Sequence, residues 1–244
     1  MREFSIYALV IGCSLLLAFV YERDSSAVIH AAAAEEPGPA PGMETGGTEA
    51  AAGPGAPGSF PMFAGLDSVL HQNVHLPDLD GVERMPLNVE RGQLRALFFV
   101  SEECEPSISY ASEIRRLCDL NADRGLSCQV IYTDPQLNAS SARRSAFAAA
   151  LAGIPKVIDH KHRIVGATGA RTAPEVVLLA SDESVPYRGR IDNRYIAPDK
   201  ARPSATEHDL RDALDEALAG KPVSKAMMPA VGCRVPDLVV ANNK

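Results

Sequence analysis

The sequence predicts an α/β fold in which a central mixed β-sheet is flanked by helices. Three observations in the 244-residue chain lead to this prediction. Short apolar runs alternate with segments of helical periodicity, as in layered α/β folds. Residues 94–100 are apolar at nearly every position, which is typical of a strand covered on both faces of its sheet. The stretch between this strand and the next apolar run is long enough for a crossover helix, so the two strands should be parallel.

Local signals divide the domain into its elements. Asp80-Gly81 is typical of a tight turn, Pro106 favours a first helical turn, and Gly220 ends a helix. Thr206 is the predicted N-cap of the last helix. In chain order we expect a hairpin of residues 74–81 and 82–87, a strand at 94–100, a helix at 107–123, a strand at 127–133, an Ala-rich helix at 140–151 with capping serines, a strand at 156–159, a hairpin of 175–180 and 185–190, and a helix at 206–220.

The N-terminal sixty residues differ in composition from the rest. Residues 4–21 form an apolar stretch of about 18 residues, close to the minimum for a membrane span, and Arg2 precedes it. The more basic side stays in the cytoplasm, so the remainder should be exported, to the periplasm or outside the cell. A signal peptide cleaved near Ala31-Ala32-Ala33 is the alternative. The predicted domains are a signal-anchor or signal peptide at 1–24, an Ala/Pro/Gly-rich disordered linker at 25–60, a folded domain at 61–222 and a C-terminal tail at 223–244.

Composition also limits the partners of the domain. The formal net charge is -7 and no basic stripe is visible, which argues against nucleic acid. We predict no cofactor and no metal site. His160-Lys161-His162 is interpreted as a polar loop, although its imidazoles, with the Met227-Met228 segment and Cys233, would also suit copper in an exported protein. The membrane is an expected partner through the N-terminal segment.

Cys104 is the candidate nucleophile. It lies between the strand at 94–100 and the following helix, where the positive end of the helix dipole favours the reactive thiolate. Glutamates at positions 102, 103 and 105 oppose this effect, because like charges raise the pKa of a thiol. Arg171 is the expected compensating cation. The alternative is that Cys104 is a small buried apolar residue.

Four segments resemble the redoxin family of thioredoxin-fold proteins, specifically its peroxiredoxin-like (AhpC/TSA-type) exported members. Residues 101–110 resemble the family's T-x-x-C-P-I-S-N-x-Y segment, and Thr172-Ala173-Pro174-Glu175-Val176 its T-P-E-V element with one residue inserted. Residues 187–193 resemble its Y-R-G-R-I-D-D hairpin end, and residues 231–233 its trailing G-C element. The resemblance covers about residues 74–238. It implies a thioredoxin-like fold in which Pro174 is cis and lies beside the reactive sulfur.

Two departures from the family pattern narrow the expected chemistry. Ser107 stands where the second cysteine of a thioredoxin C-x-x-C pair would be, so exchange through an internal C-x-x-C motif is excluded. Leu97 stands where a peroxiredoxin has the proline that shields its peroxide pocket, which weakens the case for peroxidase chemistry.

The other cysteines differ in their reach to Cys104. Cys118 lies on the same predicted helix, roughly 20 Å further along, and Cys128 lies at the far end of the neighbouring strand. Cys233 is on a tail that can extend some 40 Å past Gly220, so it is the candidate resolving thiol, unless the tail only packs against the domain or a partner. Cys118 and Cys128 could approach each other or be core residues, and base rates favour the core.

The predicted function is an extracytoplasmic thiol oxidoreductase that acts on protein thiols and disulfides or on a hydroperoxide. Cys104 would be the nucleophile, Ser101 and Arg171 would stabilise its sulfur, Pro174 would shape the substrate-facing loop, and Cys233 would resolve the intermediate. This role requires the sulfur of Cys104 to be open to solvent. The alternative is a redoxin-fold binding module without turnover.

Overall fold

The computed structural model describes residues 73–238, which belong to one compact unit of the chain. The predicted membrane segment at 1–24 and the linker at 25–60 lie outside the described residues. Between residues 73 and 238, no helix combines the length and the apolarity that crossing a membrane requires.

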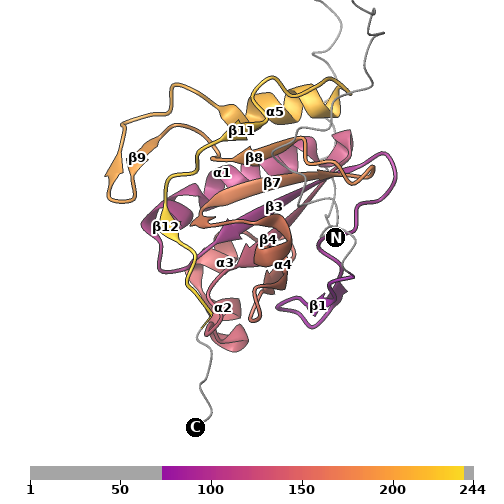
Figure 1. Cartoon of the computed structure of the whole chain (residues 1–244). Coiled ribbons are helices and arrows are strands. Elements are labelled where there is room, and N and C mark those ends of the chain that lie inside the picture. The colour runs from indigo at the N-terminus through magenta and orange to yellow at the C-terminus, as the bar shows by residue number, and fades with distance from the viewer. Residues whose placement is uncertain (1–72, 239–244) are drawn as a thin grey trace, which may run out of the picture. The chain divides into compact units, whose positions relative to one another are not determined.

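A six-stranded mixed sheet forms the centre of the described part (Figure 1), with the strand order β11-β8-β7-β3-β4-β5. The central strand β3 pairs in parallel with β4 and antiparallel with β7, which confirms the predicted crossover and mixed sheet. The outer pairs are parallel for β4 with β5 and for β8 with β11, and antiparallel for β7 with β8. The strands are β3 (Leu94–Val100), β4 (Leu126–Tyr132), β5 (Lys156–Ile158), β7 (Glu175–Ala180), β8 (Tyr187–Gly189) and β11 (Met227–Met228).

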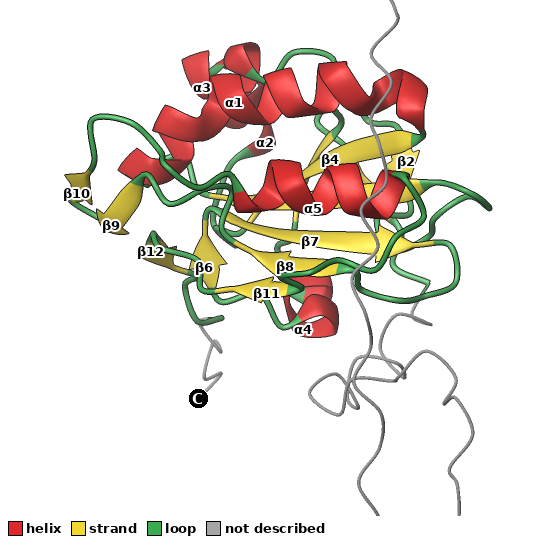
Figure 2. Ribbon diagram, turned by 90° about the horizontal axis from the view of Figure 1, so that it is seen from above, coloured by secondary structure: helices red, strands yellow, loops and turns green. Residues whose placement is uncertain are grey.

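Helices cover both faces of this sheet, as Figure 2 shows. Because side chains alternate along a strand, Phe98 points into one core and Phe99 into the other. The core around Phe98 is closed by α1 (Glu105–Asn121) and α5 (Asp209–Leu218). The core around Phe99 is closed by α4 (Arg163–Thr168). Burial on both faces explains why β3 is apolar throughout.

Short elements complete the fold. The predicted hairpin at the start of the domain is present as the antiparallel pair β1 and β2. Two further antiparallel pairs, β9 with β10 and β12 with β6, were not predicted. These elements are β1 (Leu76–Pro77), β2 (Glu83–Arg84), the 3₁₀ helix η2 (Ala122–Arg124), α2 (Ala139–Arg144), α3 (Ala146–Ala150), β6 (Thr172–Ala173), β9 (Tyr195–Ala197), β10 (Lys200–Ala201) and β12 (Cys233–Arg234).

The prediction of one continuous Ala-rich helix at 140–151 is wrong, because the segment forms two short helices. Ser145 has extended backbone angles and separates α2 from α3. Its hydroxyl accepts a hydrogen bond from the amide of Ala148 at 3.0 Å, so it caps the second helix. The first helix is capped by Asn138, whose side chain accepts from the amides of two serines that the sequence suggested as caps. A serine inside this Ala-rich segment therefore starts a new helix.

Two other helix predictions need correction. Thr206 does not cap the last helix, because α5 begins at Asp209 and the hydroxyl of Thr206 accepts from the side-chain amide of Asn193 at 2.8 Å. The helix α4 was missed, because the residues before it were interpreted as a polar loop. The carboxylate of Asp159 anchors the start of α4, accepting from three successive amides at 163–165 at distances of 2.7 to 2.9 Å.

Candidate functional site

Cys104 lies where β3 ends and α1 begins, as predicted. It is the N-cap residue of α1, with extended backbone angles, and its carbonyl accepts the first helical hydrogen bond from the amide of Ile108 at 3.0 Å. No side chain caps this helix, and Pro106 occupies its first turn. The helix dipole therefore acts on the sulfur without competition from a polar N-cap side chain.

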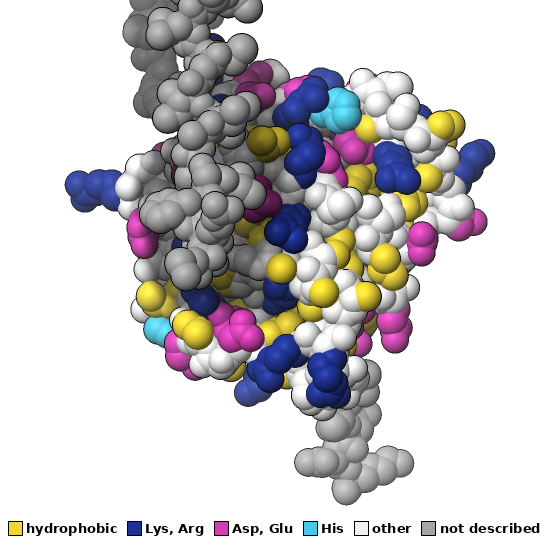
Figure 3. Space-filling view, turned by 180° about the vertical axis from the view of Figure 1, so that it is seen from behind, with side chains coloured by type: hydrophobic (Ala, Val, Ile, Leu, Met, Phe, Trp, Pro, Cys, Tyr) yellow, Lys and Arg dark blue, Asp and Glu magenta, His cyan; other side chains and the backbone are white. Residues whose placement is uncertain are grey.

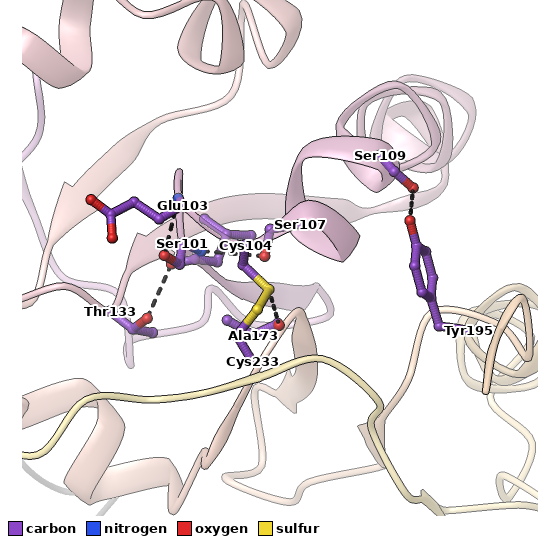
Figure 4. Close-up of a disulfide and its surroundings, with 10 residues drawn as sticks. Ser101, Glu103, Cys104, Ser107, Ser109, Thr133, Ala173, Tyr195 and Cys233 are labelled. Atoms are coloured by element: carbon purple, nitrogen blue, oxygen red, sulfur yellow. Dashed lines mark hydrogen bonds between the residues drawn. A yellow bond between two sulfur atoms is a disulfide. The ribbon is translucent and has the colours of Figure 1, made fainter. Parts of the chain in front are cut away.

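A disulfide joins Cys104 to Cys233, across 129 residues of sequence (Figure 4). The two sulfurs are 2.05 Å apart and the Cα atoms 5.9 Å apart. The sequence left open whether the tail reaches Cys104 or packs elsewhere, and the structure contains the pairing. The role of this pair in catalysis stays a prediction.

The C-terminal tail is held against the domain at two places. The strand β12 pairs antiparallel with β6, and the amide of Val235 donates to the carbonyl of Arg171 at 3.0 Å. Before it, β11 joins the edge of the main sheet beside β8. Between the two, Gly232 lies so close to β6 that a Cβ atom would be 2.1 Å from the carbonyl oxygen of Ala173. Only glycine permits this approach of the two backbones.

Pro174 follows β6 and is part of the same site. The Ala173–Pro174 peptide bond is cis, as the resemblance implied. The carbonyl oxygen of Ala173 lies 3.0 Å from the sulfur of Cys104, and Figure 4 shows the two groups facing each other. In the reduced protein this oxygen can accept a hydrogen bond from the thiol, which opposes the effect of the helix dipole.

The expectation that the sulfur of Cys104 is open to solvent is wrong for this disulfide-bonded form. Cys104 is 1% exposed, because the tail lies over it. Cys233 is partly exposed. Sequence patterns could not show this, because a two-residue strand such as β12 has no periodicity that identifies it.

Ser101 and Arg171 lie near the disulfide, but their described contacts are not with sulfur. The hydroxyl of Ser101 accepts from the amide of Glu103 at 3.3 Å. Arg171 is exposed, and its backbone bonds to Val235 and to the carboxylate of Glu175. No hydrogen bond or ion pair within residues 73–238 joins either side chain to Cys104, so their proposed roles stay predictions.

Two of the three glutamates near Cys104 are directed elsewhere. Glu102 accepts a hydrogen bond from the hydroxyl of Ser145 at 2.6 Å. Burial raises the pKa of Tyr132, and the nearby carboxylate of Glu102 raises it further. Figure 4 shows the side chain of Glu103 pointing away from the disulfide. The repulsion that these two residues exert on a Cys104 thiolate is therefore weaker than their sequence positions suggested.

Glu175 holds the segment around Pro174 in place, a role that was not predicted from the sequence. It is 5% exposed and accepts hydrogen bonds from the amides of Arg171 and Thr172 at 2.9 and 3.1 Å. Arg188 compensates its charge through an ion pair of 2.7 Å. A signal was present, because Glu175 and Arg188 belong to two of the segments that carry the family resemblance.

Exposed apolar side chains lie on α1 and on the neighbouring β9–β10 hairpin. Ile108 in the first turn of α1 is 44% exposed, and Ile196 in β9 is 50% exposed. The β9–β10 hairpin packs beside α1, where the hydroxyl of Tyr195 donates to that of Ser109 at 2.9 Å (Figure 4). Tyr110 contributes to the same contact with its ring, 5.6 Å from the ring of Tyr195. Ile108 thus presents an exposed apolar side chain one helical turn from Cys104.

The preference for Cys118 and Cys128 as core residues over a contact between them is wrong in one respect: both contact the core around Phe98, but they are also bonded to each other. They form a second disulfide, with an S–S distance of 2.16 Å and Cα atoms 6.1 Å apart. Cys118 is in the last turn of α1 and Cys128 is near the start of β4. This disulfide therefore lies at the opposite end of α1 from Cys104, as the predicted spacing required.

The rest of the described surface carries no metal-binding cluster, and its side chains are of mixed type on the face that Figure 3 shows. Between residues 73 and 238, no group of three or more His, Cys, Asp and Glu side chains is arranged to hold a metal ion. His160 and His162 each bond to a backbone carbonyl at 2.9 Å instead. Basic, acidic and apolar side chains all reach the face shown in Figure 3.

Known structures are similar to this chain in fold. No protein-family model and no curated protein matches the sequence. An uncharacterised conserved protein from Geobacillus kaustophilus is similar at 23% identity and a TM-score of 0.59, over 68% of this chain and 90% of that one. A hypothetical protein from Sinorhizobium meliloti is similar at 22% identity and a TM-score of 0.53, over 67% and 90%. With Cys104 at the start of α1 beside cis Pro174, at one end of a mixed sheet, the chain has a thioredoxin-like α/β fold.

Proposed function

We propose that this protein is an extracytoplasmic thiol-disulfide oxidoreductase whose redox couple is Cys104 and Cys233. The observation that carries the proposal is the disulfide between the N-cap cysteine of α1 and the tail, beside Pro174. A helix N-terminus stabilises a thiolate, and thiolates are both the attacking and the leaving groups of disulfide exchange.

The substrate reaction takes two steps in the reduced protein. The Cys104 thiolate attacks one sulfur of a substrate disulfide, which forms a mixed disulfide and releases the other substrate sulfur as a thiolate. The Cys233 thiolate then attacks the sulfur of Cys104. This step forms the Cys104–Cys233 disulfide and releases the second substrate thiolate, so the substrate is reduced by two electrons and the protein is oxidised by two.

The proposed location is outside the cytoplasm, with residues 1–24 as the membrane anchor or export signal. Two disulfides within one domain favour an oxidising compartment, because cytoplasmic thiols are usually kept reduced. The apolar residues 4–21 and the position of Arg2 favour the same location.

Reduction of a protein disulfide such as that of insulin, with dithiothreitol as the electron source, tests the proposal. Wild type should accelerate the reaction, while Cys104→Ser should give the background rate. Reduced Cys233→Ser, mixed with insulin after the dithiothreitol has been removed, should retain a mixed disulfide with the substrate. The matched control is the double variant Cys118→Ser/Cys128→Ser, which should keep the activity. Equal rates for wild type and Cys104→Ser would leave the binding module as the better explanation.

A hydroperoxide is the other substrate that the family resemblance implies. In that reaction the Cys104 thiolate would take one oxygen from the peroxide to form a sulfenic acid, and the leaving oxygen would take up a proton to give an alcohol, or water from hydrogen peroxide. The thiol of Cys233 would then form the same disulfide with loss of water. Hydrogen peroxide consumption, measured on the same variants, separates the two reactions. Consumption that depends on Cys104 and exceeds insulin reduction would favour the peroxide reaction.

A further inference from the structure

We propose that the thiol reductant that regenerates this protein attacks Cys233, and that Cys104 is the leaving group. The inference rests on the proposed function and adds the order of events in its reductive half. It follows from three differences between the two sulfurs, in access, in leaving-group quality and in surrounding charge.

Access favours Cys233. An incoming thiolate approaches a disulfide sulfur in line with the S–S bond, from the side opposite the partner sulfur. For Cys104 that side lies within the protein, because the residue is 1% exposed and its sulfur contacts the carbonyl oxygen of Ala173 at 3.0 Å. Cys233 is partly exposed and lies on β12 at the surface of the tail. The sulfur that is attacked is the one that the reductant can reach.

The stability of the leaving thiolate also favours attack on Cys233. Attack on Cys233 expels the sulfur of Cys104, which departs as a thiolate at the N-terminus of the 17-residue helix α1. A thiol with a lower pKa leaves faster, and the positive end of a helix dipole lowers the pKa of a thiol. Attack on Cys104 would instead expel Cys233 from a two-residue strand that has no such dipole.

Charge also distinguishes the two sulfurs. Glu105 follows Cys104 in the sequence and is exposed, so its carboxylate would repel a thiolate that approaches from the helix side. Cys233 is followed by Arg234, whose side chain is 81% exposed and lies 3.3 Å from the exposed carboxylate of Asp237, which offsets part of its charge. A thiolate therefore meets a less unfavourable charge beside Cys233 than beside Cys104.

The reductive half-reaction takes two thiol–disulfide exchange steps. A thiolate of the reductant bonds to the sulfur of Cys233, and the electron pair of the S–S bond leaves with Cys104. A second reductant thiolate attacks the reductant sulfur of this mixed disulfide, which releases Cys233 as a thiolate and gives the oxidised, disulfide form of the reductant. Substrate and reductant thus react at different sulfurs, Cys104 for the substrate and Cys233 for the reductant.

Rapid-quench mapping with 2-mercaptoethanol tests the inference on the full protein. The oxidised protein is mixed with the thiol, the reaction is stopped with acid at short times, and peptide mass spectrometry locates the mercaptoethanol adduct. We expect the adduct, extrapolated to zero time, on Cys233. An adduct mainly on Cys104, with the disulfide opened normally, would overturn this inference and leave the proposed function intact. A Cys104–Cys233 disulfide that thiols do not open would overturn both.

A charge variant provides a second measurement that does not depend on trapping an intermediate. Arg234→Glu should slow the opening of the Cys104–Cys233 disulfide by 2-mercaptoethanol about fourfold at low salt, for a charge change of two roughly 10 Å from the attacked sulfur in water. The matched control is Arg211→Glu, which makes the same charge change on the outer surface of α5. Equal rates for the two variants would contradict attack at Cys233.

Discussion

Gly232 provides a direct test of how the tail is held against the site. A Cβ atom at this position would be 2.1 Å from the carbonyl oxygen of Ala173, 2.7 Å from its carbonyl carbon and 3.0 Å from the Cδ of Pro174. The first contact is about 1 Å shorter than a side chain tolerates, and two of the three atoms are backbone. Gly232→Ala therefore has to displace β12 from β6 while the disulfide is closed.

The expected magnitude is a rise in reduction potential of roughly 20–60 mV. Overpacking at a close contact costs about 1–3 kcal/mol, and about 30 mV corresponds to 1.4 kcal/mol for a two-electron couple. The cost falls on the oxidised form, because reduction releases the tail from Cys104 and lets the added methyl group move away. The disulfide of the variant should therefore be easier to reduce.

Equilibration with glutathione redox buffers, acid quench and mass spectrometry gives both potentials in one protein. The Cys118–Cys128 disulfide is the internal reference, and it should keep its wild-type potential. The matched control is Gly166→Ala in α4, where an added Cβ meets nothing within 4 Å. A shift below about 5 mV in Gly232→Ala, under a quarter of a kcal/mol, would refute the steric reasoning.

Three further predictions concern stability. Ile114→Ala on the buried face of α1 should lower the free energy of unfolding by about 2–5 kcal/mol in urea titrations, because the side chain is 0% exposed. A loss under about 1 kcal/mol would contradict the place of Ile114 in the core. Burial alone would raise the pKa of Asp78, but hydrogen bonds from the amides of Val82 and Asp80 and from Arg84 hold it below its usual value. The contribution of the Asp78 carboxylate to the free energy of unfolding is therefore complete above about pH 4 and is lost as the pH falls through the folded-state pKa. The stability of wild type should then fall towards that of Asp78→Asn in acid. A constant difference in stability between the two proteins from about pH 6 to about pH 2 would refute this. A disulfide that closes a longer loop removes more entropy from the unfolded chain, and the bridged residues are 129 and 10 positions apart. The free energy of unfolding should therefore fall by about 5 kcal/mol in Cys104→Ser/Cys233→Ser and by about 3 kcal/mol in Cys118→Ser/Cys128→Ser. The reverse order in urea unfolding would contradict this account.

The centre of the fold was predictable because its signals are local. The strand β3 is apolar over its whole length, and its observed bounds are the predicted ones. The helix α1 places Ile114, Leu117 and Cys118 on one buried face at spacings of three and four. Glycine and proline then mark the ends of neighbouring elements. These signals fix the position of Cys104 without knowledge of distant residues.

The position of the C-terminal tail on the domain was not predictable from local signals. The strands β11 and β12 have two residues each, so no alternation of apolar and polar side chains can identify them. Their positions depend on contacts with β8 and β6, which are distant in sequence. The burial of Cys104 follows from those contacts. The sequence could show that Cys233 is able to reach Cys104, but not that the tail would cover it.

The second disulfide had a local signal that was given too little weight. Cys118 is in the last turn of α1, and the chain reverses at Gly125, which has a positive φ of 93°. Cys128 has the same strand parity as the inward-facing Leu126 and Val130. A buried helix face followed by a tight reversal and an inward strand position brings the two sulfurs together. Base rates for buried cysteine do not include this geometry.

The helix α1 thus carries one disulfide near each end, and its dipole acts on them in opposite directions. At the N-terminus it stabilises the Cys104 thiolate, which favours opening of the bond to Cys233. In the last turn it destabilises a Cys118 thiolate, which makes Cys118 a poor leaving group and protects its bond to Cys128. A graded titration with dithiothreitol should therefore release thiols at 104 and 233 first. Simultaneous release at all four positions would mean that the helix dipole does not distinguish the two bonds.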